Sequence, residues 1–111
     1  MNEATVTKRH FRTKEDALRE IVAVGWWPVS WRDPPGETYA PHKHDADQTV
    51  YLVEGGMQLE IGGRVYDLEP GDKLDVPAFT VHSATAPGGA VYIIGMPKVD
   101  LIAEHALPPD A

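Results

Sequence analysis

The chain has 111 residues, of which 42% are hydrophobic and 24% charged, and its formal net charge is −7. This length suits one domain with a single core, and the negative charge excludes nucleic acid and anionic membrane surfaces as expected partners. The lack of cysteine excludes disulfides, thiolate metal sites and cysteine catalysis. No apolar signal-peptide core is visible near the N-terminus, so we expect a cytoplasmic protein.

The chain begins with a basic cluster within residues 1–12, which is typical of a solvated and flexible chain end. We therefore expect a flexible N-terminal segment over residues 1–12 and a single domain over residues 13–111. The domain would open with a short helix that Thr13 caps. Its apolar face would be formed by Leu18, Ile21 and Val22, and Gly25 would end it.

Three tryptophans follow the predicted helix, at positions 26, 27 and 31. The alternation of Trp27, Val29 and Trp31 with less apolar residues predicts a half-buried strand. Pro28 has no backbone donor, which places this strand at a sheet edge or at a bulge. The tryptophans could fill the core, cover the mouth of a barrel or form a contact between two copies of the chain. We expect a homodimer in which this segment takes part.

Glycine and proline pairs divide the rest of the chain into short segments. Gly-Gly at 55–56 and 62–63 indicates hairpins, and Pro-Gly at 70–71 indicates a type II turn. The predicted strands are Thr49–Glu54, Met57–Ile61, Arg64–Leu68, Lys73–Val76, Thr80–Ala84 and Ala90–Met96. Their even spacing predicts an all-β fold, a small antiparallel β-barrel or sandwich. Residues 98–111 carry one apolar cluster, which suits either a strap across the barrel or a frayed tail.

His42, His44 and Gln48 are the most informative polar residues of the sequence. They share parity with the apolar residues that follow, so in an unbroken strand all three would point into the barrel. Buried imidazoles and a buried amide need partners, and one metal ion would serve them all. His82, in a later strand, is the other candidate ligand.

The charge of this candidate ligand set indicates a type of chemistry. Three imidazoles suit Zn, Fe, Ni, Cu or Mn. Gln48 is neutral where a carboxylate would be usual, so a divalent ion would keep its full charge. That favours Lewis-acid action on a carbonyl or hydroxyl, and it makes a higher oxidation state harder to reach.

Two stretches of the chain resemble the two motifs of the cupin family. The first is Gly36, His42-x-His44, Gln48 and Gly55, with Gln48 at the position of the family's usual Glu. The second is Gly71, Pro77 and His82, in which Phe79 replaces a family Gly and Ala86 replaces the closing Asn. The motif core thus covers residues 36–86.

The cupin resemblance implies a jelly-roll β-barrel with one divalent metal, Zn, Ni, Mn or Fe, in its mouth. By the same resemblance, the ligands would be His42, His44, Gln48 and His82. A three-His-one-Gln set is similar to that of the cupins that linearise unsaturated uronates and of the cupin hydroxynitrile lyases. It therefore implies an isomerase or lyase acting on a small molecule such as a sugar acid or an aldehyde. A metal-dependent dioxygenase and a non-catalytic binding or sensor module are the alternatives.

Residues near the expected metal offer candidates for proton transfer. Tyr39 shares a loop with His42 and is the candidate catalytic residue; Tyr51, Tyr92 and Asp75 are further candidates for contacts around the site. An anionic substrate would need a cation in the pocket. Lys43 is close in sequence, but its parity is opposite to that of the ligands, which predicts an outward side chain and counts against a uronate.

Overall fold

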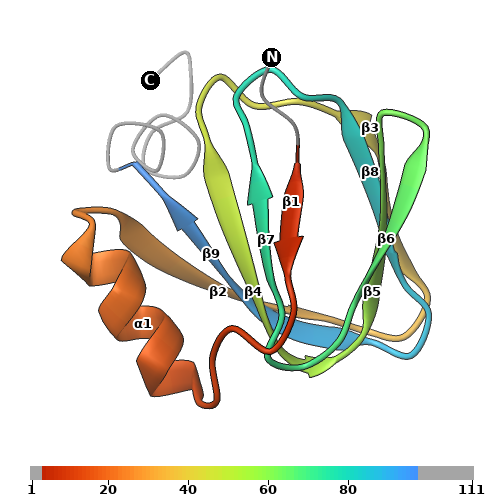
Figure 1. Ribbon diagram of the computed structural model, residues 1–111. Coiled ribbons are helices and arrows are strands. Elements are labelled where there is room, and N and C mark those ends of the chain that lie inside the picture. The colour runs from red at the N-terminus through yellow and green to blue at the C-terminus, as the bar shows by residue number, and fades with distance from the viewer. Residues whose placement is uncertain (1–3, 98–111) are drawn as a thin grey trace, which may run out of the picture.

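Alternating apolar residues build two antiparallel sheets that face one another, with one helix outside them (Figure 1). The computed structural model describes residues 4–97. In chain order the elements are β1 (Thr5–Thr7), α1 (Lys14–Ala23), β2 (Trp27–Asp33), β3 (Glu37–His42), β4 (Gln48–Gly55), β5 (Met57–Ile61), β6 (Arg64–Leu68), β7 (Lys73–Val76), β8 (His82–Ala86) and β9 (Ala90–Met96).

The strands form a jelly roll of two open sheets, and the expected all-β fold is confirmed. One sheet has five strands in the order β1-β7-β4-β9-β2, and the other has four in the order β3-β8-β5-β6. Among the described strands no ladder of hydrogen bonds joins the two sheets, so they enclose a sandwich and not a closed barrel. The main core lies between them and includes Leu52, Leu59, Leu68 and Leu74.

The predicted strands agree well with the structure. Four of the predicted ranges match β5, β6, β7 and β9 at both ends. The edge position expected from Pro28 is confirmed, because β2 is the last strand of its sheet. The range predicted as Thr80–Ala84 lies two residues too early, because the chain before β8 turns through Phe79 in a left-handed conformation (φ 60°) and pairing begins only at His82.

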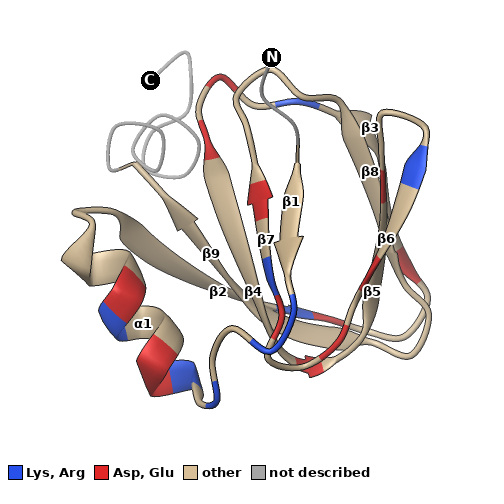
Figure 2. Cartoon of the chain, in the orientation of Figure 1, with Lys and Arg blue, Asp and Glu red and all other residues tan. Residues whose placement is uncertain are grey.

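Helix α1 is capped as the sequence predicts. Thr13 Oγ1 accepts a hydrogen bond from the Asp16 N–H at 3.2 Å, and Asp16 Oδ2 accepts one from the Thr13 N–H at 3.2 Å. The predicted apolar face was wrong at Val22, which is 62% exposed. Ile21, which was predicted, and Ala17, which was not, are the buried residues of the helix. Ile21 packs in a second cluster on the outer face of the five-stranded sheet. Figure 2 shows acidic and basic segments on the rest of the helix.

The beginning of the chain differs from the expected flexible segment. Thr5–Thr7 form β1, which pairs with β7 in the register Val6 to Leu74, and Phe11 is buried in the second cluster. Backbone pairing and a buried aromatic side chain thus tie residues 5–7 and Phe11 to the sandwich, and the expected domain boundary after residue 12 stays a prediction. The strap or tail predicted over residues 98–111 lies outside the described residues. No helix among the described residues is long and apolar enough to cross a membrane.

Candidate metal centre

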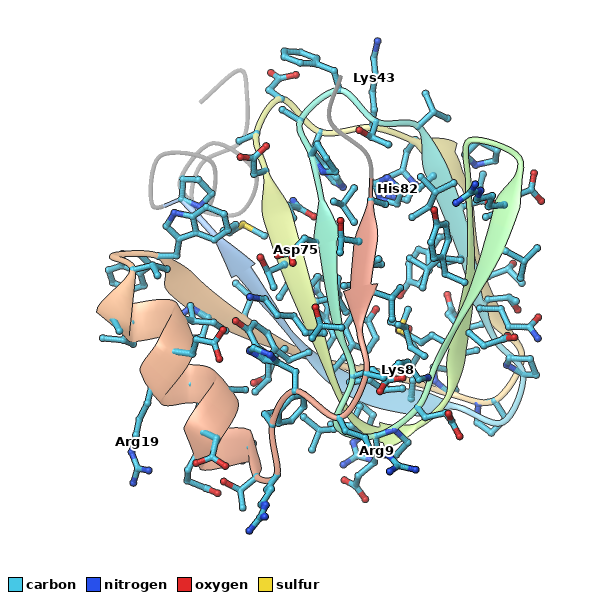
Figure 3. All side chains as sticks on the ribbon, viewed as in Figure 1. Lys8, Arg9, Arg19, Lys43, Asp75 and His82 are labelled. Carbon is cyan, nitrogen blue, oxygen red and sulfur yellow. The ribbon has the colours of Figure 1, made fainter. Side chains whose placement is uncertain are left out.

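Three histidines converge at one end of the space between the sheets. One ring nitrogen from each of His42, His44 and His82 lies within 4.8 Å of the other two. The ring centroids are 4.3 Å apart for His42 and His82, 5.1 Å for His42 and His44, and 5.5 Å for His44 and His82. Figure 3 shows His82 between the sheets near this end. Three imidazoles this close are a ligand set of the kind that transition metals take.

Each histidine has its own backbone support. His42 is the last residue of β3 and His82 is the first of β8, and the two are cross-strand partners. A register shift between Tyr39 and His42 lets the end of β3 turn toward the cavity. His44 lies in the connection to β4, and its carbonyl accepts a hydrogen bond from the Phe79 N–H at 2.8 Å. The two loops that carry the site therefore hold one another.

Hydrogen bonds orient two of the imidazoles. Nδ1 of His42 lies 2.7 Å from the Ala40 carbonyl oxygen, and Nδ1 of His82 lies 2.9 Å from the Thr80 carbonyl oxygen. A carbonyl only accepts, so Nδ1 donates its proton in both contacts. In the neutral ring Nε2 then keeps its lone pair, which is the tautomer that binds a metal through Nε2.

The environment favours the neutral, ligating form of His82. Burial lowers the pKa of His82, and charge on His42 and His44 lowers it further, although the hydrogen bond to the Thr80 carbonyl acts in the opposite sense. A lowered pKa means that less proton competition opposes a metal at neutral pH.

Gln48 faces the same cavity, but not in the way the sequence suggested. The unbroken strand assumed for His42, His44 and Gln48 is wrong: His42 ends β3 in one sheet, and Gln48 begins β4 in the other. The loop between them lets the chain cross from sheet to sheet. Gln48 is only 7% exposed and lines the cavity together with the three histidines. All four predicted ligands therefore lie at one cavity, and their binding to a metal stays a prediction.

The cavity itself is largely apolar and has a volume of about 220 Å³. Its walls include Val50, Leu59, Ile94 and Met96. Trp31 also lines it and is 38% exposed, so this tryptophan lies where the cavity meets solvent. None of the described residues that line the cavity is a lysine or an arginine.

A buried carboxylate lies behind two tyrosines of this cavity. Tyr39 donates a hydrogen bond to Asp33 Oδ1 at 2.6 Å, and Tyr92 donates one to Asp33 Oδ2 at 2.9 Å. Burial, followed by the bond to Asp33, raises the pKa of both tyrosines. Asp33 was not among the residues predicted from the sequence, because an Asp before Pro34 is typical of a turn. Its parity with Trp31 was the available signal that it points inward.

The other predicted neighbours of the site divide into two groups. Tyr39 and Tyr92 line the cavity as expected, although their hydroxyls bind Asp33. Tyr51 packs edge-on against Phe11 beneath the helix, and Asp75 accepts a hydrogen bond from Thr49, so neither belongs to the cavity. Lys43 is exposed and extends away from His82 (Figure 3). The expectation that Lys43 points outward is confirmed.

The donor set fits a divalent transition metal. Two imidazoles are fixed with Nε2 available, the third lies within the same 4.8 Å cluster, and an amide faces the same cavity. An imidazole binds a metal in its neutral form and an amide carries no charge, so this ligand set would be neutral, which suits Zn, Ni, Mn or Fe and does not select among them.

The family model for the cupin domain matches residues 29–94, which is more than half of the chain. The chain belongs to the cupin family. Among curated proteins, this cupin is 37% identical over 54 residues to 5-nitrosalicylic acid 1,2-dioxygenase of Bradyrhizobium sp and 43% identical over 69 residues to quercetin 2,3-dioxygenase of Bacillus subtilis. These matches cover 49% and 61% of the cupin, but only 26% and 20% of the two relatives.

Solved structures of other cupins support the fold. KdgF from Halomonas sp. is 28% identical with a TM-score of 0.58, over 68% of this chain and 74% of its own. An RmlC-like cupin from Shewanella frigidimarina is 27% identical with a TM-score of 0.61, over 68% of this chain and 70% of its own.

Proposed function

We propose that this cupin is a metal-dependent enzyme of the isomerase or lyase type, acting on a small oxygen-bearing substrate. The observation that carries the proposal is the convergence of three histidines and one glutamine, with no carboxylate among them, at an apolar cavity. A divalent ion bound there would supply Lewis acidity toward a carbonyl or hydroxyl oxygen. His42, His44, His82 and Gln48 would hold it.

The chain's own residues limit the substrate. The apolar walls of the cavity suit the carbon skeleton of a substrate. The carbonyl groups of Ala40 and Thr80 keep the imidazoles of His42 and His82 in the tautomer that can bind a metal. The described lining offers no lysine or arginine to pair with a carboxylate. This favours an uncharged, aldehyde-like substrate over a sugar acid. Tyr39 stays a candidate for proton transfer.

A dioxygenase is the second candidate. It is favoured by the two curated relatives, both of which are named dioxygenases. Against it stands the neutral amide of Gln48, which does not stabilise a higher oxidation state. Oxygen uptake measured with an electrode, on protein loaded with iron, manganese or nickel, would separate the two candidates: uptake with an aromatic substrate supports the dioxygenase.

Elemental analysis tests the proposal first. Untagged protein, purified without chelator, is compared with the His42→Ala/His82→Ala double variant and with His10→Ala. His10 binds Glu20 at 2.8 Å on the outside of the molecule, so it is a matched histidine that should not matter. We expect one equivalent of transition metal in the wild type and in His10→Ala, and none in the double variant.

The loaded protein is then assayed for aldehyde and sugar-acid lyase and isomerase activity. Absence of metal, even after each ion is added back, contradicts the enzyme proposal and supports a binding module.

A further inference from the structure

The cavity has a second polar site, at a distance from the histidines, that the metal chemistry does not use. It consists of Tyr39, Tyr92 and Asp33, and we call it the tyrosine subsite. Asp33 is 5% exposed and Tyr92 is also 5% exposed, so these polar groups are almost wholly withdrawn from water. A buried carboxylate is costly unless it is hydrogen-bonded, and here each of its oxygens accepts one tyrosine O–H.

The hydrogen-bond directions decide what this subsite can bind. A tyrosine hydroxyl has one proton, and in both tyrosines that proton is given to Asp33. The two hydroxyls also interact with one another, and the lone pairs that are left on their oxygens are what remains for a molecule in the cavity. The subsite is therefore an acceptor, and its complement is a donor. The negative charge of Asp33 behind it, and a described lining without lysine or arginine, disfavour an anionic group.

Strand register places the subsite well away from the histidines. Tyr39 stands opposite Ala84, which is two residues along β8 from His82, or roughly 7 Å. Tyr92 stands opposite Leu52, which is four residues along β4 from Gln48, or roughly 13 Å. A rigid molecule with polar groups at both ends would span this length.

The space between the two polar ends suits a ring. Val50, Leu59 and Ile94 line the cavity and offer no hydrogen-bonding side chain. An apolar cavity of about 150 Å³ is large enough for benzene, and this one measures about 220 Å³. One ring with a substituent at each end fits that volume.

We propose that Tyr39 and Tyr92, positioned by Asp33, bind the hydroxyl group of an uncharged, ring-bearing substrate whose other oxygen lies at the histidines. Only the placement of the substrate's other oxygen at the histidines rests on the proposed function. The acceptor subsite itself needs no metal. The substrate class is thus a small hydroxylated ring compound with a carbonyl or a second hydroxyl at the opposite end.

Two simple probes test the subsite. Phenol has a ring and an O–H donor, and anisole has the same ring and oxygen but no donor. Their affinities are measured by calorimetry or NMR titration on the full chain, as purified and after removal of metal by chelator. We expect phenol to bind about fivefold to tenfold more tightly than anisole in both forms, which is the effect of one hydrogen bond.

Variants assign the preference to named groups. Tyr39→Phe and Tyr92→Phe should each reduce it to about twofold or less, whereas Tyr66→Phe, a half-buried tyrosine outside the cavity lining, should leave it unchanged. Asp33→Asn should also reduce it to about twofold or less, because the amide N–H₂ donates to a tyrosine oxygen and turns that hydroxyl's proton toward the cavity, where the oxygen of either probe can accept it.

Equal affinity of the two probes for the wild type, or an unchanged preference in both tyrosine variants, overturns the proposal. If one variant shows no thermal unfolding transition and is therefore not folded, the probe preference of the remaining folded variants tests the proposal. A protein that contains no metal but prefers phenol would refute the enzyme proposal and keep the subsite. A protein that contains metal but binds phenol and anisole equally would refute the subsite and leave the enzyme proposal in place.

Discussion

His42 and His82 are cross-strand partners on β3 and β8, with ring centroids 4.3 Å apart. Two bare imidazoles in this position gain little from one another, and protonation of both would be repulsive. The pair is explained if a cation lies between the rings and the third histidine. The site is thus built into the register of the four-stranded sheet, and the loop residue His44 completes the cluster.

Gln48→Glu tests the charge of the ligand set. An anionic ligand should keep metal binding and tighten it by about tenfold, since a close opposite charge is added. Any Lewis-acid activity should change, because the ion's effective charge falls. Chelator competition measures the affinity. Gln58→Glu is the control, since Gln58 is exposed on β5. Unchanged activity in Gln48→Glu would contradict our explanation of the glutamine.

Asp72 should make stability depend on pH in the acid range. Burial alone would raise the pKa of Asp72, but hydrogen bonds from Lys8 and from the N–H groups of Glu69 and Arg9 outweigh it and lower the pKa below its ordinary 3.8. A lowered pKa gives stability that is complete above the unfolded value and lost as pH falls through the folded one. We expect the free energy of unfolding to decline below about pH 4.

Asp72→Asn isolates this contribution. The variant should be less stable at pH 7 by about 2 kcal/mol, because charge-assisted hydrogen bonds are lost. Its deficit relative to the wild type should shrink as the pH falls toward 2. Urea unfolding at several pH values measures both effects. A deficit that is constant with pH would show that the charge of Asp72 does not contribute.

Phe79 occupies a conformation that suits glycine. Its φ is 60°, its side chain is 65% exposed, and the cupin motif has glycine at this position. Phe79→Gly should be more stable than Phe79→Ala by about 1 kcal/mol, because alanine keeps the left-handed cost and glycine does not. Thermal unfolding of both variants beside the wild type measures this. Equal stability would mean that the loop relaxes when the phenyl ring is removed.

Gly55 should tolerate no side chain. Its φ is 79°, and a Cβ atom there would collide with the backbone carbonyl of Gly89. Gly55→Ala should cost about 3 kcal/mol or more, or prevent folding. Gly88→Ala is the matched control, since a Cβ atom there meets nothing within 4 Å, and it should change stability by about 0.5 kcal/mol or less. Circular dichroism melts compare the two.

We propose that the exposed edge strand β2 forms the contact of a homodimer. Trp27 lies on this strand and is 44% exposed. Solution scattering of the wild type should give the mass of a dimer at micromolar concentration, and Trp27→Ser should shift it toward the monomer. Val65→Ser, which changes another exposed apolar residue, is the control. A wild-type monomer would refute the dimer.

Most of the fold could be predicted because the turns are marked by residues with few alternatives. Gly62 and Gly63 both have positive φ, at 59° and 80°, and they bound β5 and β6 where the sequence placed the break. The helix was predictable from the reciprocal bonds of Thr13 and Asp16. The buried face of the helix was harder to predict. Ala17 and Val22 lie on either side of Ile21 on the helix surface, and only the packing against the sheet determines which of them is buried.

The sequence pointed to four residues that line one cavity, but not to the way in which the chain brings them there. The spacing of His42, His44 and Gln48 was informative, but nothing local in the sequence shows that the chain changes sheets between His42 and Gln48. Asp33 was missed for a related reason: its partners Tyr39 and Tyr92 are brought to it by tertiary packing, six and 59 residues away. Long-range pairing of this kind leaves no periodic signal.

The division of the candidate ligands between the two sheets has a mechanical consequence. Gln48 belongs to the five-stranded sheet, and His42 and His82 belong to the four-stranded one. A single ion held by all three would link two layers that no ladder of backbone hydrogen bonds joins among the described strands, and it would do so at the histidine end, away from the Tyr39–Asp33 hydrogen bond that also crosses between them. Occupancy would then set how far the two layers can part at that end, and with it how readily a molecule enters.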